Sequence, residues 1–273
     1  MGPAGYQRPE TVEAAVAALA GGGRILAGGT DLYPAGFSGP VVDVTGVAEM
    51  QGVRVGPREI RIGAAATWAE VAAAGLPAGA RALQQAAGLV GGWQIQNAGT
   101  VGGNLCNASP AADGVPPLLA MGAEVEIAGL SGVRRVPLGA FLLGPRRVAL
   151  GPGDLLVAVV IPASGFAGVS RFLKLGARAH LVISIAMVAV RLGVREGVVA
   201  EARVALGACS PVALRLAAVE RALEGVALGQ AAGVDVDVSA LAPLDDIRAT
   251  SGYRRAAAAE LVKRAVAEVV ACC

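Results

Sequence analysis

Two glycine-rich segments hold the residues best suited, by type and spacing, to binding a charged molecule. Residues 27–32 read Ala-Gly-Gly-Thr-Asp-Leu, and residues 99–104 read Gly-Thr-Val-Gly-Gly-Asn. Glycine permits positive φ and close backbone approach, and successive N–H groups in such a segment form a concave nest for an anion. Two nests predict a diphosphate held from two sides, as in a dinucleotide. Neither segment matches a Walker or Gly-x-Gly-x-x-Gly fingerprint, so the alternative is two tight loops in a chain with 39 glycines.

Polar side chains follow both segments. They are Thr30 and Asp31 after the first, and Asn104, Asn107, Ser109 and Asp113 after the second. Hydroxyl, amide and carboxylate groups beside a phosphate nest suit hydrogen bonds to a ribose, a ribityl chain or the edge of a flavin.

Groups for acid–base catalysis are scarce. His180 is the only histidine, so no Ser-His-Asp or Cys-His set can be assembled, and we expect His180 to be structural. None of the four cysteines, at 106, 209, 272 and 273, makes a Cys-x-x-Cys pair, which predicts no zinc or iron–sulfur ligand set. Cys106 is either a small apolar filler or a thiol near the ligand. We therefore expect no catalytic and no metal-binding residue.

Composition excludes several other classes of protein. The net charge of +2 and the 3% aromatic content give no basic patch or stacking platform, so nucleic acid is not an expected partner. The apolar stretch 181–190 is too short for the ~20 residues that span a bilayer. The lack of a signal segment and of a disulfide framework predicts a cytoplasmic location. Only 16% of residues are charged, which favours a surface covered by a partner.

Periodicity predicts an α+β chain with a boundary near residues 164–168. We expect a domain at 1–165, in subdomains of about 1–57 and 58–165, and a second domain at 169–273 with an antiparallel sheet and helices on one face. Predicted helices cover 9–20, 67–74 (from the Thr67–Glu70 capping box), 80–90, 115–121, 211–224 and 252–271. Predicted strands cover 24–27, 41–44, 53–55, 60–62, 123–127, 155–161, 181–192 and 201–207.

The two motifs point to a family. Residues 27–32 and 94–113 resemble the flavin-binding signatures of the FAD subunits of molybdenum hydroxylases, such as the medium subunit of carbon monoxide dehydrogenase and the flavin domain of xanthine dehydrogenase. The opening 6–13 and the stretches 172–178 and 243–254 are similar to other parts of that family. The resemblance implies a two-subdomain FAD-binding α/β part of the vanillyl-alcohol-oxidase/PCMH type, followed by a smaller α+β C-terminal domain.

The resemblance also implies roles for single residues. One side of the pyrophosphate would be wrapped by Leu26, Ala27, Gly28, Gly29, Thr30, Asp31 and Leu32, and the other side closed by Gly99, Thr100, Gly102, Gly103 and Asn104. Cys106, Asn107 and Asp113 would lie along the flavin and ribityl chain, Val90, Ile95 and Leu156 would contact the rings, and Lys174 would reach a cofactor charge. The chain has Gln96 where the family often has arginine, which implies a different flavin potential or partner docking.

The function implied is an oxidoreductase subunit that carries non-covalent FAD. It would take electrons from a small subunit with [2Fe-2S] clusters and pass them to an external acceptor, while a large subunit with the molybdenum cofactor oxidises the substrate. The expected assembly is a dimer of heterotrimers. Two alternatives are a free-standing FAD oxidase or dehydrogenase and a non-redox nucleotide-binding assembly protein.

Overall fold

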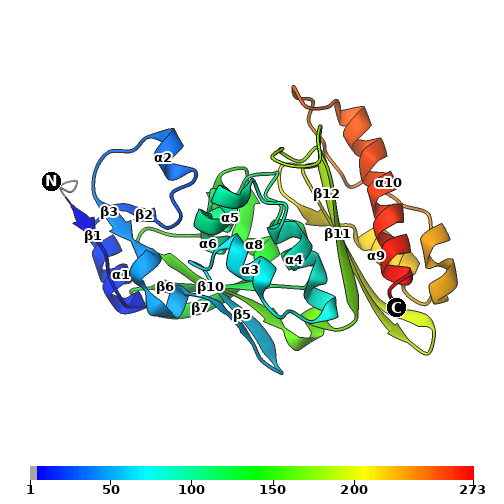
Figure 1. Ribbon diagram of the computed structural model, residues 1–273, viewed down its shortest axis with the longest axis horizontal. Helices are drawn as coiled ribbons and strands as arrows, with labels where there is room; N and C mark the ends of the chain where they lie inside the picture. Colours follow the sequence, from blue (N-terminus) through cyan, green and yellow to red (C-terminus); the bar gives the residue numbers. More distant parts are fainter. Residues whose placement is uncertain (1–4) are drawn as a thin grey trace.

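A computed structural model describes residues 5–273 of the chain; residues 1–4 of the expected first domain lie outside the described residues. Three sheets follow one another along the long axis of the molecule, in chain order (Figure 1). The small N-terminal sheet lies at one end and helix α10 at the other. No helix within residues 5–273 is both long and apolar enough to cross a membrane.

The N-terminal sheet is parallel, with strand order β1-β3-β2. Its strands are β1 (Tyr6–Gln7), β2 (Arg24–Leu26) and β3 (Val41–Asp43). Helix α1 (Val12–Ala20) begins after Thr11, whose hydroxyl accepts from the N–H of Ala14 at 3.2 Å. That cap explains why the helix starts three residues later than the expected residue 9. Its Val16 and Leu19 are buried, as the apolar spacing predicted.

The central sheet is antiparallel, with strand order β4-β5-β10-β6-β7. Its strands are β4 (Val53–Val55), β5 (Glu59–Gly63), β6 (Glu124–Gly129), β7 (Gly132–Pro137) and β10 (Leu155–Pro162). Strand β10 is buried from Leu155 to Ile161 and pairs with β5 and β6. Because β4 pairs with β5, a division of the chain near residue 57 would separate the two strands of one hairpin.

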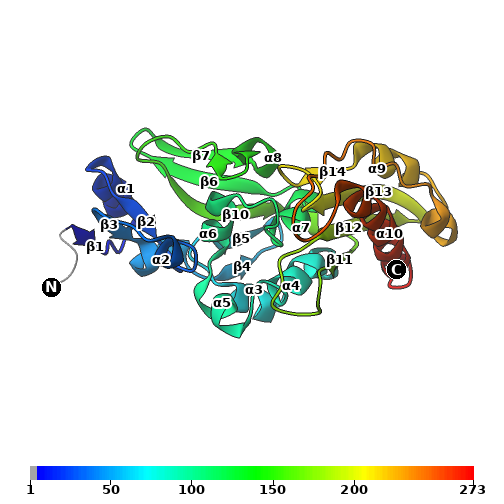
Figure 2. The same ribbon diagram turned by 90° about the horizontal axis from the view of Figure 1, so that it is seen from above.

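Short helices surround the central sheet (Figure 2). They are α3 (Trp68–Ala73), α4 (Arg81–Ala87), α5 (Trp93–Ala98), α6 (Val101–Asn107), α7 (Val115–Ala120) and α8 (Leu138–Phe141), with a small hairpin of β8 (Leu142–Gly144) and β9 (Arg147–Val148). Helix α2 (Leu32–Ala35) lies at the N-terminal end of the molecule instead. The predicted capping box is present: Thr67 N–H donates to Glu70 Oε2 at 2.7 Å, and Glu70 N–H donates to Thr67 Oγ1 at 3.2 Å. Short 3-10 helices cover Val44–Gly46, Ala48–Met50, Ala78–Ala80, Ala163–Phe166 and Leu228–Gly233.

The C-terminal sheet is antiparallel in the order β11-β12-β13-β14. Its elements are β11 (Val169–Leu175), β12 (Ala186–Arg195), β13 (Val198–Gly207), β14 (Leu214–Arg215), α9 (Ala217–Leu223) and α10 (Ser251–Val270). Alternate residues of β12 enter two cores: Val188 packs with α9 and α10, whereas Met187 packs with the central domain. Both faces of this strand are therefore buried, which accounts for its nearly continuous apolar sequence.

Three sequence-based expectations were wrong in local detail. The strand expected at 181–192 begins only at Ala186, because Ser184 turns into the interior and donates its hydroxyl to Asp113 at 2.6 Å. The helix expected at 211–224 is confined to Ala217–Leu223, because Leu214 and Arg215 pair with β13 instead. The segment 99–104, expected as a loop, runs into α6.

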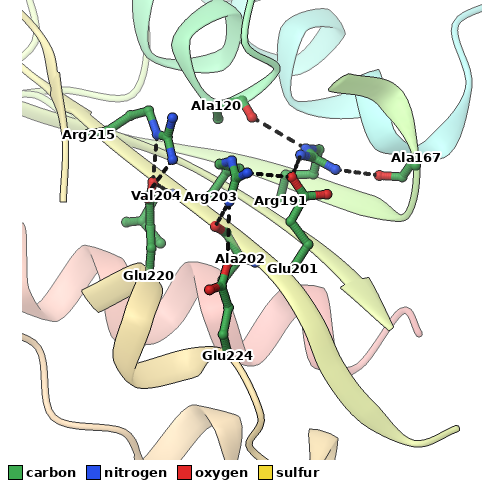
Figure 3. A network of polar contacts seen from close by, with 10 residues as sticks. All are labelled: Ala120, Ala167, Arg191, Glu201, Ala202, Arg203, Val204, Arg215, Glu220 and Glu224. Carbon is green, nitrogen blue, oxygen red and sulfur yellow. Dashed lines mark hydrogen bonds and ion pairs between the residues drawn. The ribbon is translucent and has the colours of Figure 1, made fainter. Parts of the chain in front are cut away.

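A polar network joins the C-terminal sheet to the central domain (Figure 3). The buried guanidinium of Arg191 donates to the carbonyls of Ala120 at 3.3 Å and Ala167 at 3.0 Å, and pairs with Glu201 at 2.9 Å. Arg203 bridges Glu201 and Glu224. Because the Ala120 carbonyl lies at the end of α7, Arg191 ties β12 to a helix of the central domain. Arg215 and Glu220 form a separate pair at 2.6 Å.

Removal of the α3 cap should destabilise the central domain measurably. We expect Thr67→Ala to lower the free energy of unfolding by about 1 kcal/mol, because an N-terminal N–H of the helix loses its acceptor. Thr67→Ser is the matched control, since it keeps the hydroxyl. Urea unfolding followed by tryptophan fluorescence measures both, because buried Trp68 is the first residue of α3. Equal midpoints for Thr67→Ala and wild type would contradict the role of this cap.

Candidate functional site

A cavity of about 440 Å³ opens between the N-terminal sheet and the helices of the central domain. This volume lies within the usual range for sites that bind small molecules and cofactors. The predicted residues that line it are Ala27, Gly28, Gly29, Thr30, Asp31, Leu32, Val90, Ile95, Gly99, Thr100, Gly102, Gly103, Asn104, Cys106, Asn107 and Leu156. The structure thus brings both glycine segments to one cavity.

The first glycine segment connects β2 to α2 and supplies hydrogen-bond donors. Within residues 5–273, the backbone N–H groups of Gly28, Gly29, Thr30 and Asp31 donate to no protein acceptor. Gly29 has φ of +69°, a conformation that favours glycine. Consecutive free N–H groups around such a residue form the nest that the sequence predicted.

Gly28 brings the two segments together. A Cβ added at this position would lie 1.8 Å from the carbonyl oxygen of Ala98 and 3.0 Å from Cα of Gly99. No residue with a side chain fits that gap. The absence of a side chain at Gly28 therefore lets the loop after β2 touch the segment that leads into α6.

The second glycine segment differs from the expected nest, because it opens α6 and the N–H groups of residues 101–103 already have acceptors within the protein. Val101 N–H donates to the Ala66 carbonyl at 2.9 Å, Gly102 N–H to the Ala64 carbonyl at 2.8 Å, and Gly103 N–H to Thr100 Oγ1 at 3.1 Å. Gly103 lines the cavity, and a Cβ added there would lie 2.9 Å from Thr100 Oγ1. A side chain at this position would therefore press on the hydroxyl that caps α6.

Amide and thiol side chains of α6 also reach the cavity. Asn104 Oδ1 is buried without a hydrogen-bond donor in the described part of the chain, and an unsatisfied buried acceptor is costly unless a ligand supplies a donor. Asn107 accepts a hydrogen bond from Arg146. Burial raises the pKa of the Cys106 thiol to about 12, so this side chain is a neutral, unreactive part of the wall near pH 7.

Sequence reasoning missed two cations at the cavity. Both line the cavity: Arg24 is the first residue of β2, and Arg146 lies in the β8–β9 turn with φ of +60°. Neither guanidinium pairs with a carboxylate within residues 5–273. Arginines in this state suit phosphate oxygens. The sequence held no signal for them, because their approach depends on how β2 and the β8–β9 turn pack.

Apolar side chains complete the wall. To the predicted Leu32, Val90, Ile95 and Leu156 the structure adds Ile25, Ala35, Val44, Met50, Ala64, Trp68, Leu150 and Leu155. Of these, Val44, Met50, Ala64, Trp68 and Leu155 are buried, whereas Ile25 is 36% exposed. No sequence signal had placed these residues at a cavity.

Three predicted site residues do not line the cavity. Leu26 is buried in β2, whereas Asp113 and Lys174 form a buried ion pair at 2.6 Å. Lys174 also donates to the carbonyl of Leu89, next to Val90, at 3.1 Å. Burial raises the pKa of Asp113, and the adjacent Lys174 and the hydroxyl of Ser184 act against that rise. The pair therefore joins β11 to the segment that leads into α7.

Two further residues that the sequence singled out, Gln96 and His180, do not line the cavity. Gln96 of α5 is half-buried and donates to the carbonyl of Gly88 at 3.0 Å, so it joins α5 to the segment that follows α4. His180 lies in the exposed loop after β11 and is not among the cavity-lining residues. No group of three or more metal-ligating side chains occurs within residues 5–273.

Comparison with known proteins identifies the family. The model of the FAD binding domain in molybdopterin dehydrogenase matches residues 2–164, and the model of the CO dehydrogenase flavoprotein C-terminal domain matches residues 171–269. The putative xanthine dehydrogenase FAD-binding subunit XdhB of Escherichia coli is 31% identical, over 98% of this chain and 96% of that protein. The carbon monoxide dehydrogenase medium chain of Hydrogenophaga pseudoflava is 29% identical, over 96% and 95%.

Solved structures agree with this result. A crystal structure of the Cu,Mo-CO dehydrogenase matches with a TM-score of 0.89 and 28% identity, covering 99% of each chain. Quinoline 2-oxidoreductase from Pseudomonas putida 86 matches with a TM-score of 0.85 and 26% identity, over 97% of this chain and 96% of that one. The chain belongs to the FAD-binding family of molybdopterin dehydrogenases and is an oxidoreductase flavoprotein. The family resemblance and the fold class expected from the sequence are confirmed.

A side chain at Gly103 should weaken flavin binding. We expect Gly103→Val to lower FAD affinity by more than about tenfold, because Gly103 lines the cavity and an added Cβ would lie 2.9 Å from Thr100 Oγ1, the hydroxyl that caps α6. Gly75→Val is the matched control, since an added Cβ there meets open space. Flavin content per chain and circular dichroism give the result. Full flavin content in Gly103→Val protein would show that this wall does not contact FAD.

Proposed function

We propose that this chain is the FAD-carrying electron-transfer subunit of a heteromeric molybdenum hydroxylase. It takes electrons from an iron–sulfur subunit and passes them to an external acceptor, while a separate molybdenum-cofactor subunit oxidises the organic substrate. The observation that carries the proposal is the cavity between the two glycine segments, in a chain that matches relatives named FAD-binding subunit and medium chain along nearly its whole length. The cytoplasmic location stays a prediction.

The cavity's own chemistry fits FAD. The free N–H groups of residues 28–31 would hold the diphosphate, with Arg24 and Arg146 available to its negative charge. Gly103 leaves room for close approach, and the unsatisfied Oδ1 of Asn104 would accept from a hydroxyl or N–H group of the cofactor. Val90, Ile95 and Leu156 would contact the ring system, as the family resemblance implies.

The role of Asp113 and Lys174 follows from their pairing. Because each neutralises the other away from the cavity lining, we infer that they hold β11 of the C-terminal domain against the segment around Val90. Bound FAD would exchange electrons in one- and two-electron steps, and the protein would supply position and charge. We divide the chain correspondingly into an FAD-binding unit at 1–165 and a supporting unit at 169–273.

Electron transfer without substrate chemistry is favoured by the groups at the cavity. Within the described chain its ionisable lining residues are Arg24, Asp31, Cys106 and Arg146. The Cys106 thiol stays protonated near neutral pH, and Asp31 stands beside the free N–H groups where the diphosphate would lie. No side chain in this set has the position of a general base beside an organic substrate.

Partner subunits are proposed by the same reasoning. Relatives carry names of components, such as the 6-hydroxypseudooxynicotine dehydrogenase complex subunit alpha of Paenarthrobacter nicotinovorans, 29% identical over 97% of this chain. We propose an iron–sulfur small subunit and a molybdenum-cofactor large subunit, doubled into a dimer of heterotrimers. The low charged fraction of 16% supports extensive coverage of the surface.

The FAD should be held without a covalent bond. Neither histidine nor tyrosine lines the cavity within residues 5–273, and the Cys106 thiol is protonated at neutral pH. Acid precipitation of the purified protein is therefore expected to release all yellow colour into the supernatant, measured by absorbance. Colour that stays with the pellet in wild-type protein but not in Cys106→Ser would reveal a thioether and overturn the prediction.

The chain without partners should accept electrons but not oxidise substrates. Dithionite is expected to bleach its flavin, whereas an aldehyde or an N-heterocycle should not, because no lining side chain within the described residues is placed as a general base beside an organic substrate. The same chain co-purified with iron–sulfur and molybdenum subunits should be bleached by the substrate of the complex. Anaerobic absorbance spectra measure both. Rapid bleaching of the isolated chain by an organic substrate would favour the free-standing oxidase, and absence of flavin bands would favour the non-redox alternative.

A further inference from the structure

Large apolar side chains are exposed on three segments that are far apart in the sequence. Trp93 opens α5 and is 73% exposed, and Ile247, in the loop before α10, is 99% exposed. Leu181 and Ile183 of the β11–β12 loop (residues 176–185) and Leu244 are also exposed. None of these five residues lines the main cavity. Exposed apolar residues that gather on one surface mark a site of contact with another molecule.

A close contact joins the β11–β12 loop to α5. Leu181 packs over the start of the helix, because a Cβ added at Gly92 would lie 2.4 Å from Cδ2 of Leu181. Leu181 has φ of +52°, an uncommon conformation for a residue with a side chain, and Arg178 donates to its carbonyl at 3.0 Å. Ile95 of the same helix lines the main cavity. This part of the apolar surface therefore lies at the edge of the cavity.

One buried guanidinium joins the loop before α10 to the β11–β12 loop. Arg254 donates to the carbonyl of Ile185 at 2.6 Å and to Oδ1 of Asp246 at 2.7 Å. The same Oδ1 atom accepts from the N–H groups of the two residues that follow Ile247, at 2.8 Å and 3.2 Å. Ile247 is therefore presented by a turn whose backbone is held from within, next to the end of the β11–β12 loop.

The extent and the charge of this surface favour a protein as its occupant. A small electron acceptor would need only the mouth of the cavity, whereas three segments offer a protein several apolar anchors, among them a tryptophan. Residues 88–98 and 176–185 hold no acidic side chain. Their one arginine, Arg178, pairs with no carboxylate within residues 5–273. A partner surface that is apolar at its centre and acidic opposite Arg178 is complementary to it.

We propose that Trp93, Leu181, Ile183, Leu244 and Ile247 form the docking surface for the iron–sulfur subunit. The proposal rests on the proposed function, in which that subunit delivers electrons to FAD. An electron donor must come close to the flavin, and this surface begins at the edge of the cavity, beside Ile95. The partner's facing surface would carry apolar residues for the five side chains and carboxylates for Arg178.

The variant Ile247→Asp tests the end of the surface that lies farthest along it from the cavity. Because Ile247 is almost fully exposed and outside the cavity lining, flavin content and reduction by dithionite should stay at wild-type levels. Affinity for the purified iron–sulfur subunit should fall by more than about tenfold, as for an apolar anchor of an interface. Titration calorimetry measures the affinity, and bleaching of the flavin by the reduced subunit gives the rate of electron transfer, which should fall as well.

The matched control is Leu130→Asp, which places the same charge on an exposed leucine between β6 and β7, outside the proposed surface. This variant should bind the subunit as the wild type does. Amide hydrogen exchange tests the surface without any substitution: residues 176–185 and 242–250 should exchange at least about tenfold more slowly in the complex than in the free chain.

The outcomes separate the docking surface from the proposed function. Equal affinity of Ile247→Asp and wild type, or unchanged exchange of both segments in a complex that forms, would overturn the docking surface and leave the proposed function standing. A flavin-loaded wild-type chain that binds no iron–sulfur subunit would overturn both. Association of two copies of this chain through these segments would also overturn the proposal, because it assigns the surface to a different partner.

Discussion

The contact between the backbone of Gly28 and the carbonyl of Ala98 is the constraint on which the main cavity depends. These residues are 70 positions apart in sequence, yet an added Cβ on the first would fall 1.8 Å from the oxygen of the second. Backbone against backbone is the closest packing that protein segments achieve, and only glycine allows it. Through this contact the loop after β2 meets the junction of α5 and α6. These two segments form opposite sides of the cavity, and the contact fixes their relative position.

The two glycine segments look alike in sequence but serve different physical purposes. Residues 28–31 leave their N–H groups free, so they supply donors. The N–H groups of Gly102 and Gly103 are bound within the protein, and Gly103 lines the cavity without a side chain. Arg24 and Arg146 add positive charge at the cavity. An anion in the cavity would thus meet the hydrogen-bond donors of residues 28–31 and the positive charge of Arg24 and Arg146. Gly102 and Gly103 of α6 would face it without side chains.

The C-terminal sheet supports the domain that holds the cavity, because both faces of its strand β12 are buried. Met187 and Val188, adjacent in β12, belong to different cores. Buried polar groups fix the same contact: Arg191 spans to the end of α7, and Lys174 pairs with Asp113. Removing one partner of such a buried pair leaves an uncompensated charge, which is strongly destabilising. The position of the sheet against the cavity is therefore specified by geometry as well as by apolar burial.

The sequence by itself determined the family, the capping box of α3, the central strand β10 and the residue types at the main cavity, because these depend on local patterns and motif spacing. Only the tertiary structure decided that segment 99–104 opens a helix in which the N–H groups of residues 101–103 are satisfied by residues 64, 66 and 100. It also decided that Lys174 meets Asp113, and that Arg24 and Arg146 reach the cavity. The physical reason is that a hydrogen-bond donor or a charge is free or paired according to its neighbours in space, and those neighbours come from segments far apart in the chain.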